Sequence, residues 1–83
     1  MKMKKETVQE IVKMLVDKKE VIQNHKEWLK ENAKYNSLET RLAFDCWRVL
    51  PNEFRIETSR TQDLKDDHIE TGMRRALKEI GIV

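Results

Sequence analysis

Apolar residues recur at helical spacing through the first part of the chain. The residues that follow one another at seven-residue intervals are Val8, Leu15, Ile22 and Leu29. A seven-residue repeat keeps side chains on one side of an α-helix, with a drift of about 20° per heptad, and neither glycine nor proline occurs before Pro51. The pattern therefore predicts one long helix over residues 6–34. Its weak point is Lys18 and Lys19, where the apolar side rotates, and a break near Asn24 is an alternative.

The segment over residues 37–50 is apolar around roughly half of a helical circumference. Its apolar residues are Leu38, Leu42, Ala43, Phe44, Cys46, Trp47, Val49 and Leu50. Its one consistently polar ridge consists of Arg41, Asp45 and Arg48, at the i+4 and i+3 spacings that allow ion pairs. A helix with so much apolar surface must be covered on two sides, so this segment is predicted to be the central helix.

Two further segments follow Pro51. Residues 54–58 alternate like a short strand, but one strand alone cannot satisfy its backbone hydrogen bonds. Residues 51–65 are therefore predicted to form an extended connector, with half of an intermolecular strand pair as the alternative. Residues 66–80 place their apolar side chains on one narrow arc and precede Gly81, a common residue type after a helix end. They are predicted to form a C-terminal helix.

Polar residues mark the expected starts of the second and third helices. Asn36 or Ser37 is the expected N-cap of the second helix, and Asn36 with Glu39 has the spacing of a capping box. Asp67 with Glu70 has the same spacing at the start of the third helix. Acidic side chains there also suit the positive end of the helix dipole.

These elements predict an all-α fold of three helices in a single domain, residues 1–83. A chain of 83 residues is near the lower size limit for one stable core, and a single cysteine rules out an intramolecular disulfide. Three helices leave apolar surface on the first and second helix uncovered, and a second copy of the chain can bury it. We therefore expect a homodimer formed through the first and second helices.

Composition and charge narrow the class of protein. Hydrophobic and charged residues each make up 39% of the chain, which suits amphipathic helices. No apolar run approaches the ~18 residues of a membrane span, and the basic start MKMKK lacks the apolar segment of a signal peptide. With the unpaired cysteine, these features predict a cytoplasmic protein. Residues 1–34 carry nine lysines against six acids, a bias that is mild for a nucleic-acid binder.

Candidate reactive side chains are few and far apart. Cys46 with His25 or His68 could supply a thiol nucleophile and its base, but no spacing places a base and an orienting group beside the thiol. The same three residues lack the closely spaced ligand pairs of a zinc site. We therefore expect that the protein is not an enzyme and holds no metal or cofactor. Cys46 is assigned to the core and His25 to the edge of the helical bundle.

Four acids at the start of the C-terminal helix raise a second chemical possibility. They are Asp63, Asp66, Asp67 and Glu70. Such a cluster could bind a divalent cation or serve in general acid catalysis, but its spacing misses the calcium-loop pattern. Acids are ordinary at helix starts, so this cluster is predicted to cap the helix.

Four aromatic residues are the candidates for a partner interface: Trp28, Tyr35, Phe44 and Trp47. Tryptophan and tyrosine are enriched at binding hot spots, although on helical apolar faces such residues are more often part of the core. The apolar surface that the three predicted helices leave uncovered supports the interface assignment, and the core remains the alternative.

The leading functional hypothesis is a small interaction or regulatory protein that acts through a helical apolar face. The alternative is a nucleic-acid-binding regulator that uses Arg74, Arg75 and Lys78 with the lysines of the first helix. The competing interpretation is that these basic residues belong to an ordinary solvent-exposed helix face, because Glu70 is spaced to pair with Arg74 and Glu79 with Arg75. The sequence contains no pattern that identifies a biological process or a particular partner.

Overall fold

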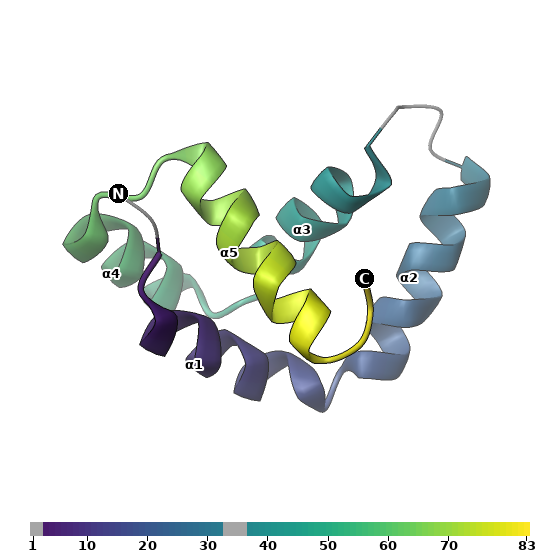
Figure 1. Cartoon of the computed structure of the whole chain (residues 1–83), viewed down its shortest axis with the longest axis horizontal. Coiled ribbons are helices and arrows are strands. Elements are labelled where there is room, and N and C mark those ends of the chain that lie inside the picture. Colours follow the sequence, from purple (N-terminus) through teal and green to yellow (C-terminus); the bar gives the residue numbers. More distant parts are fainter. Residues whose placement is uncertain (1–2, 33–36) are drawn as a thin grey trace.

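The computed structural model describes residues 3–32 and 37–83, and within them it is helical with no strand. The helices are α1 (Lys5–Val16), α2 (Lys19–Asn32), α3 (Leu38–Arg48), α4 (Asn52–Gln62) and α5 (Asp66–Glu79). α5 packs against α1 and α3, and α2 packs against α3 (Figure 1). The all-α prediction is confirmed. The three-helix arrangement is wrong, because the described residues form five helices.

The predicted long helix over residues 6–34 is instead two helices, α1 and α2, which meet at an angle (Figure 1). Residues 17–20, four positions that would form about one helical turn, have no apolar side chain, so nothing there packs on the core and holds one straight helix. The backbone N–H of Lys18 donates to the carbonyl of Leu15 at 2.8 Å, at the end of α1. The weak point read from the sequence is confirmed, whereas the alternative break near Asn24 is wrong because that residue lies inside α2.

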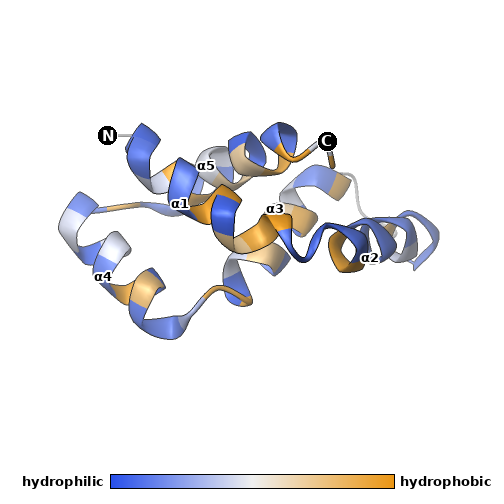
Figure 2. Cartoon of the chain, turned by 90° about the horizontal axis from the view of Figure 1, so that it is seen from below, coloured by the Kyte–Doolittle hydropathy of each residue, from blue (hydrophilic) through white to orange (hydrophobic). Residues whose placement is uncertain are grey.

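Apolar side chains of α1, α2, α3 and α5 meet in one core. The largest fully buried ones are Val8, Ile11, Leu15, Leu29, Leu42, Met73, Leu77 and Ile82. Figure 2 shows the apolar parts of α1 and α3 gathered in the middle of the molecule. Each such side chain contributes roughly 1.5–3 kcal/mol through its removal from water. No helix in the described part of the chain is long and apolar enough to cross a bilayer.

The predicted central helix is α3, and its core position is confirmed. Trp47 and Leu50 are buried, whereas Val49, which follows the last helical residue, is exposed. The hydroxyl of Ser37 caps the helix by accepting a hydrogen bond from the backbone N–H of Thr40. The capping box predicted with Asn36 lies outside the described residues.

The predicted extended connector over residues 51–65 is wrong, because α4 occupies most of it. Phe54 and Thr58 are one helical turn apart and face inward, half-buried and buried, whereas Ile56 lies on the opposite side and is exposed. The alternating pattern of residues 54–58, which resembles a strand, is therefore also compatible with a helix that has a narrow inner face. A helix also pairs its own backbone groups, which a lone strand cannot do.

The C-terminal helix predicted over residues 66–80 is α5, which begins at the predicted residue and ends one residue earlier, at Glu79, but its predicted capping box is wrong. The helix begins at Asp66, after Lys65, whose backbone N–H donates to Nδ1 of His68 at 3.0 Å. Glu70 lies too far into α5 for the cap, and instead accepts a hydrogen bond from Thr40 of α3 at 2.8 Å. The acid predicted for the cap thus joins two helices.

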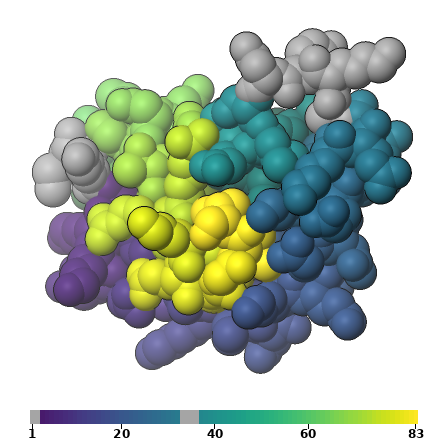
Figure 3. All heavy atoms as spheres, turned by 45° about the vertical axis from the view of Figure 1, so that its right-hand side comes forward, coloured from purple at the N-terminus to yellow at the C-terminus, as the bar shows by residue number. Residues whose placement is uncertain are grey.

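α5 ends in the glycine motif that the sequence indicates. Gly81 has φ of +84°, and its N–H donates to the carbonyl of Lys78, while the N–H of Ile82 donates to the carbonyl of Leu77. This pair of bonds is the Schellman motif, in which a left-handed residue after the helix satisfies its last carbonyls. The last residues then lie against α2 (Figure 3), where Lys26 Nζ donates to the Ile82 carbonyl.

Candidate functional site

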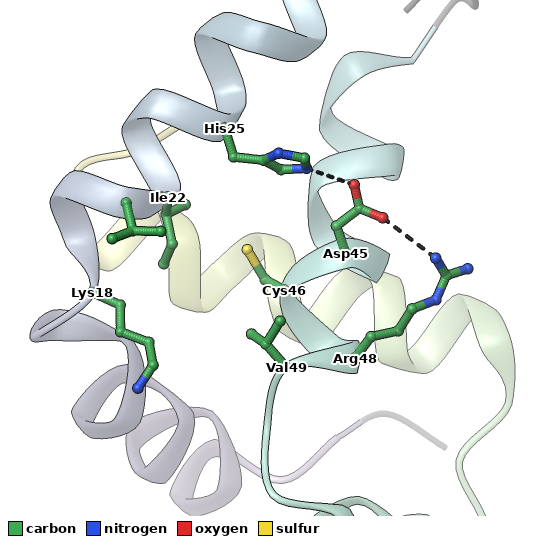
Figure 4. Close-up of a pocket in the computed structure, with 8 residues that line it drawn as sticks. Lys18, Ile22, His25, Asp45, Cys46, Arg48 and Val49 are labelled. Atoms are coloured by element: carbon green, nitrogen blue, oxygen red, sulfur yellow. Dashed lines mark hydrogen bonds and ion pairs between the residues drawn. The ribbon is translucent and has the colours of Figure 1, made fainter.

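A largely apolar hollow lies between α2 and α3 and has a volume of about 490 Å³. The residues that line this α2–α3 hollow are Lys18, Val21, Ile22, His25, Asp45, Cys46, Arg48 and Val49 (Figure 4). Ile22 and Cys46 are buried and form its floor, whereas Val21 is 68% exposed and Val49 is 62% exposed at its rim. In Figure 4 α5 lies behind the hollow, so the hollow opens on the face turned away from α5.

A hydrogen bond crosses one side of the hollow and ties α2 to α3. His25 Nε2 lies 2.7 Å from Asp45 Oδ2. Arg41 and Arg48 approach the same carboxylate at 3.4 and 3.5 Å, so the i+4 and i+3 pairing expected of the polar ridge is confirmed. Because the Asp45 side chain is only 17% exposed, the pairing is less screened than at an open surface. The sequence offered no signal that His25 would join this group.

Trp28 extends the apolar surface beside this hydrogen bond. Its ring stacks on that of His25, with centroids 5.9 Å apart and planes within 10° of parallel. Trp28 is nevertheless 54% exposed. A large aromatic side chain is thus held in place while much of its surface remains in water.

Cys46 faces the hollow but is a poor nucleophile. Burial raises the pKa of its thiol to about 11, and the negative charge of Asp45 adds to the shift. At neutral pH the thiol is protonated, and only the thiolate is reactive. In the described part of the chain, no three side chains of His, Cys, Asp or Glu are grouped to hold a metal ion.

The four aromatic candidates do not form one exposed surface. Trp28 is exposed, Phe44 is half-buried against the core, and Trp47 is only 8% exposed. Tyr35 lies outside the described residues. Two other exposed apolar residues, Val21 and Val49, line the α2–α3 hollow, although helical periodicity alone assigns both to the core. The exposure of Val49 could have been anticipated from the sequence, because Val49 stands directly before the Leu50-Pro51 pair that terminates its helix.

The three basic candidates of the last helix do lie together. Arg74, Arg75 and Lys78 line a shallow hollow with Thr71 and Glu39. The Arg74 side chain is hydrogen-bonded within the fold, because its Nη2 donates to the hydroxyl of Thr40 at 3.1 Å. Its Nε also lies 3.4 Å from a Glu70 oxygen. The face therefore carries charges of both signs.

The four acids near the start of α5 have separate roles. Asp66 and Asp67 occupy its first turn, as predicted, and Glu70 bonds to α3. Asp63 ends α4 in the left-handed region, with φ of 49° and ψ of 52°. The four acids therefore lie at the end of α4, at the start of α5 and at a contact between α5 and α3.

A second hollow, on α4, has a different character. The residues that line it are Glu53, Phe54, Ile56 and Glu57. Ile56 is 57% exposed, and the two glutamates are the only charged members of the set. Ile56 also lines a neighbouring hollow with Arg55 and Arg60, so charges of both signs surround this apolar side chain.

Comparison of the chain with models of protein families, with curated proteins and with solved structures found no match in any of the three.

Proposed function

We propose that this chain is a small, non-catalytic interaction protein whose α2–α3 hollow binds a second copy of the chain. The observation that carries the proposal is the pair Val21 and Val49, both exposed by more than 60% at the mouth of a hollow with an apolar floor. Single exposed apolar residues are common on protein surfaces. A group of them around a concave site is typical of an interaction surface.

The energetic gain from covering this site supports the same proposal. Burying a valine-sized side chain contributes on the order of 1.5 kcal/mol or more, and two valines and the stacked Trp28 are available. The surrounding polar groups are already held, because Asp45 binds His25 across the hollow at 2.7 Å. A partner therefore meets a largely prearranged surface, which lowers the ordering cost of binding.

The homodimer expected from the sequence is the form of this proposal that we favour. The sequence assigned the contact to the first and second predicted helices, and the hollow is built from α2 and α3, which correspond to the end of the first and the whole of the second. We further propose a regulatory role in the cytoplasm. The single free, buried cysteine is compatible with a reducing compartment.

Sedimentation velocity tests the proposal. The wild-type chain is expected to sediment at high micromolar concentration as a species of twice the monomer mass of 10.0 kDa. The double variant Val21→Ser with Val49→Ser is expected to sediment as a monomer. Val16→Ser is the matched control, because Val16 is also 50% exposed but does not line the hollow. A wild-type monomer at that concentration would contradict the proposal.

Nucleic-acid binding is the second candidate, and its support is the common location of three cations. Arg74, Arg75 and Lys78 line one hollow, to which lysines of α1 and α2 could add long-range attraction. This candidate predicts duplex binding that weakens steeply with salt. It also predicts that Arg75→Ala with Lys78→Ala weakens binding while leaving the fold intact. No mobility shift with DNA or RNA at low salt would rule it out.

A further inference from the structure

We propose that the α2–α3 hollow is also the binding site of a small anionic amphiphile, an aliphatic carboxylate of medium chain length, which competes there with the second copy of the chain. The aliphatic chain of the ligand lies on the floor of the hollow, and its carboxylate binds Lys18. The binding itself concerns the single chain and can be measured on it. The competition rests on the proposed self-association and adds to it a means of regulation.

The hollow has the size and the lining of a small-molecule site. Its volume of about 490 Å³ lies within the range of about 300–1,000 Å³ that is usual for such sites, which are mostly apolar with a few polar groups. Ile22 and Cys46 form its floor and are buried, whereas Val21 and Val49 stand exposed at its rim. An aliphatic chain in the hollow removes the exposed surface of all these side chains from water.

The carboxylate at one end of the hollow is already paired within the fold. Asp45 Oδ2 lies 2.7 Å from His25 Nε2. The same carboxylate approaches Arg41 at 3.4 Å and Arg48 at 3.5 Å. A cationic ligand would have to displace these contacts, so Asp45 does not favour a ligand with a positive head group.

The cation at the opposite end of the hollow has no such partner. In Figure 4 the apolar residues lie between the His25–Asp45 bond and Lys18. The Lys18 side chain is exposed, and it makes no hydrogen bond or ion pair with another residue in the part of the chain that the structure describes. An ammonium group binds a carboxylate through charge-assisted hydrogen bonds. A free cation beside an apolar floor therefore matches a ligand with an anionic head and an apolar chain.

The charges around the hollow favour the same class of ligand. The charged residues that line it are Lys18, Arg48 and Asp45, which are two cations and one carboxylate. Arg41 adds a third cation at the Asp45 carboxylate. With His25 neutral, the sum is positive, so the head group that the site attracts is an anion.

Two other hollows lack this combination of an apolar floor with a free cation. The hollow that contains Arg75 has Val83 as its single apolar residue. The hollow that Ile56 lines contains Arg55 and Arg60, but both guanidinium groups are engaged. Arg55 Nε donates to a backbone carbonyl at 3.1 Å, and Arg60 Nη2 donates to a carboxylate of its own helix at 2.7 Å.

The ligand and the second copy need the same side chains. Val21 and Val49 carry the proposed self-association, and an aliphatic chain between them covers both. A ligand that binds the monomer and is excluded from the dimer shifts the equilibrium towards the monomer by mass action. The concentration of the carboxylate would then set the oligomeric state.

A titration with decanoate tests the site directly. Amide NMR spectra of a dilute ¹⁵N-labelled chain are recorded while decanoate is added at concentrations below those at which it forms micelles. Saturable shift changes are expected at Ile22, Cys46 and Val49, which line the hollow, and none at Thr71, which lines a hollow elsewhere. Spectra without saturable changes at the hollow would overturn the proposal.

Exchange of one lysine tests the position of the head group. Lys18→Gln is expected to weaken the binding of decanoate about three- to fivefold, as for the loss of an exposed ion pair, and to leave the binding of uncharged decanol unchanged. Lys19→Gln is the matched control, because Lys19 is the adjacent exposed lysine but does not line the hollow. Equal effects of the two variants would overturn the assignment of the carboxylate to Lys18.

The length of the ligand tests the role of the apolar floor. Each CH₂ group that becomes buried is expected to strengthen binding about fourfold, so hexanoate is expected to bind at least about tenfold more weakly than decanoate. Val49→Glu places a carboxylate at the rim and is expected to weaken decanoate binding about tenfold, with circular dichroism as the check of the fold. Equal affinities for hexanoate and decanoate would show that the aliphatic chain is not bound, and would overturn the proposal.

Further outcomes separate the ligand site from the self-association and from a lipid surface. At high micromolar concentration, saturating decanoate is expected to convert the dimer to a monomer in sedimentation velocity, and a dimer that persists overturns the competition. A chain that is monomeric without decanoate overturns the self-association, while the NMR titration still decides the ligand site. Binding to phosphatidylglycerol vesicles without binding of decanoate would overturn the assignment to a free carboxylate.

Discussion

α3 meets its two neighbours in different ways, and the difference locates the site. Towards α5, Thr40 donates to Glu70 at 2.8 Å and accepts from Arg74 at 3.1 Å, while Met73, Ala76 and Leu77 of α5 have no exposed surface. Towards α2, the His25–Asp45 bond stands beside a hollow of about 490 Å³ with exposed valines at its rim. The first contact is complete within one chain, and the second leaves apolar side chains exposed to solvent.

The largest expected difference between the two contacts is in side-chain packing. Leu77→Ala removes a fully buried side chain from α5, so it is expected to lower the free energy of unfolding by about 3 kcal/mol. Val21→Ala, at the rim of the hollow, is expected to change it by no more than about 0.5 kcal/mol. Urea denaturation at low micromolar concentration measures both. Similar losses for the two variants would show that the hollow is as important to the fold as the α5 contact.

The thiol at the floor of the hollow tests how well that floor excludes water. With its pKa raised from 9.0 to about 11, Cys46 has a thiolate population at pH 8 that is roughly 100-fold below that of an unperturbed thiol. Alkylation with iodoacetamide at pH 8 is therefore expected to be about 100-fold slower in the folded chain than in urea. Equal rates would mean that the floor is open to solvent.

The same shift has a consequence for stability at high pH. The unfolded thiol ionises from about pH 9, whereas the folded thiol keeps its proton until about pH 11, so ionisation favours the unfolded state between these values. The free energy of unfolding of the wild type is expected to fall over this range relative to Cys46→Ala, which has no thiol. Parallel pH profiles of the two proteins would contradict the shifted pKa.

The helical class and the positions of α3 and α5 could be predicted because local residues determine them. The apolar circumference of residues 37–50, and Gly81 after the last helix, act within a few turns of the chain. α4 could not be recognised, because Phe54, Ile56 and Thr58 suit a strand or a helix equally well until a neighbour selects one face. The division into α1 and α2 was visible in the sequence only as the run of polar residues 17–20. Whether such a run separates two helices depends on how the neighbouring helices, such as α3, pack against them.

The candidate site was harder to predict than the fold because it joins residues distant in sequence. Periodicity places Val21 and Val49 on apolar sides of their helices, but only the angle between α2 and α3 leaves them exposed. His25 and Asp45 are 20 positions apart, and no spacing rule relates them. The aromatic residues mislead for the same reason, since Trp28 and Trp47 look alike in sequence and differ in exposure.

The hydrogen bond across the hollow is expected to have an intermediate effect. Asp45→Ala removes the carboxylate that His25 contacts at 2.7 Å and that also offsets Arg41, so it is expected to lower the free energy of unfolding by about 1–2 kcal/mol. Glu57→Ala is the matched control, because its pair with Arg60 is exposed on both sides, and about 0.5 kcal/mol or less is expected. Equal effects of the two variants in urea denaturation would show that α2 and α3 are held together by apolar contacts alone.

The smallest expected effect on folding belongs to Trp28. Because Trp28 is 54% exposed and stacks on His25, Trp28→Ala is expected to cost less than about 1 kcal/mol when the protein is dilute and monomeric. Trp47→Ala, at 8% exposure, is expected to cost about 3 kcal/mol or more. Tryptophan fluorescence during urea denaturation reports both. A small cost for Trp28→Ala combined with weaker dimerisation at high concentration would assign this residue to the interface. A cost comparable to that of Trp47→Ala would instead place Trp28 in the core and restrict the binding surface to the valines.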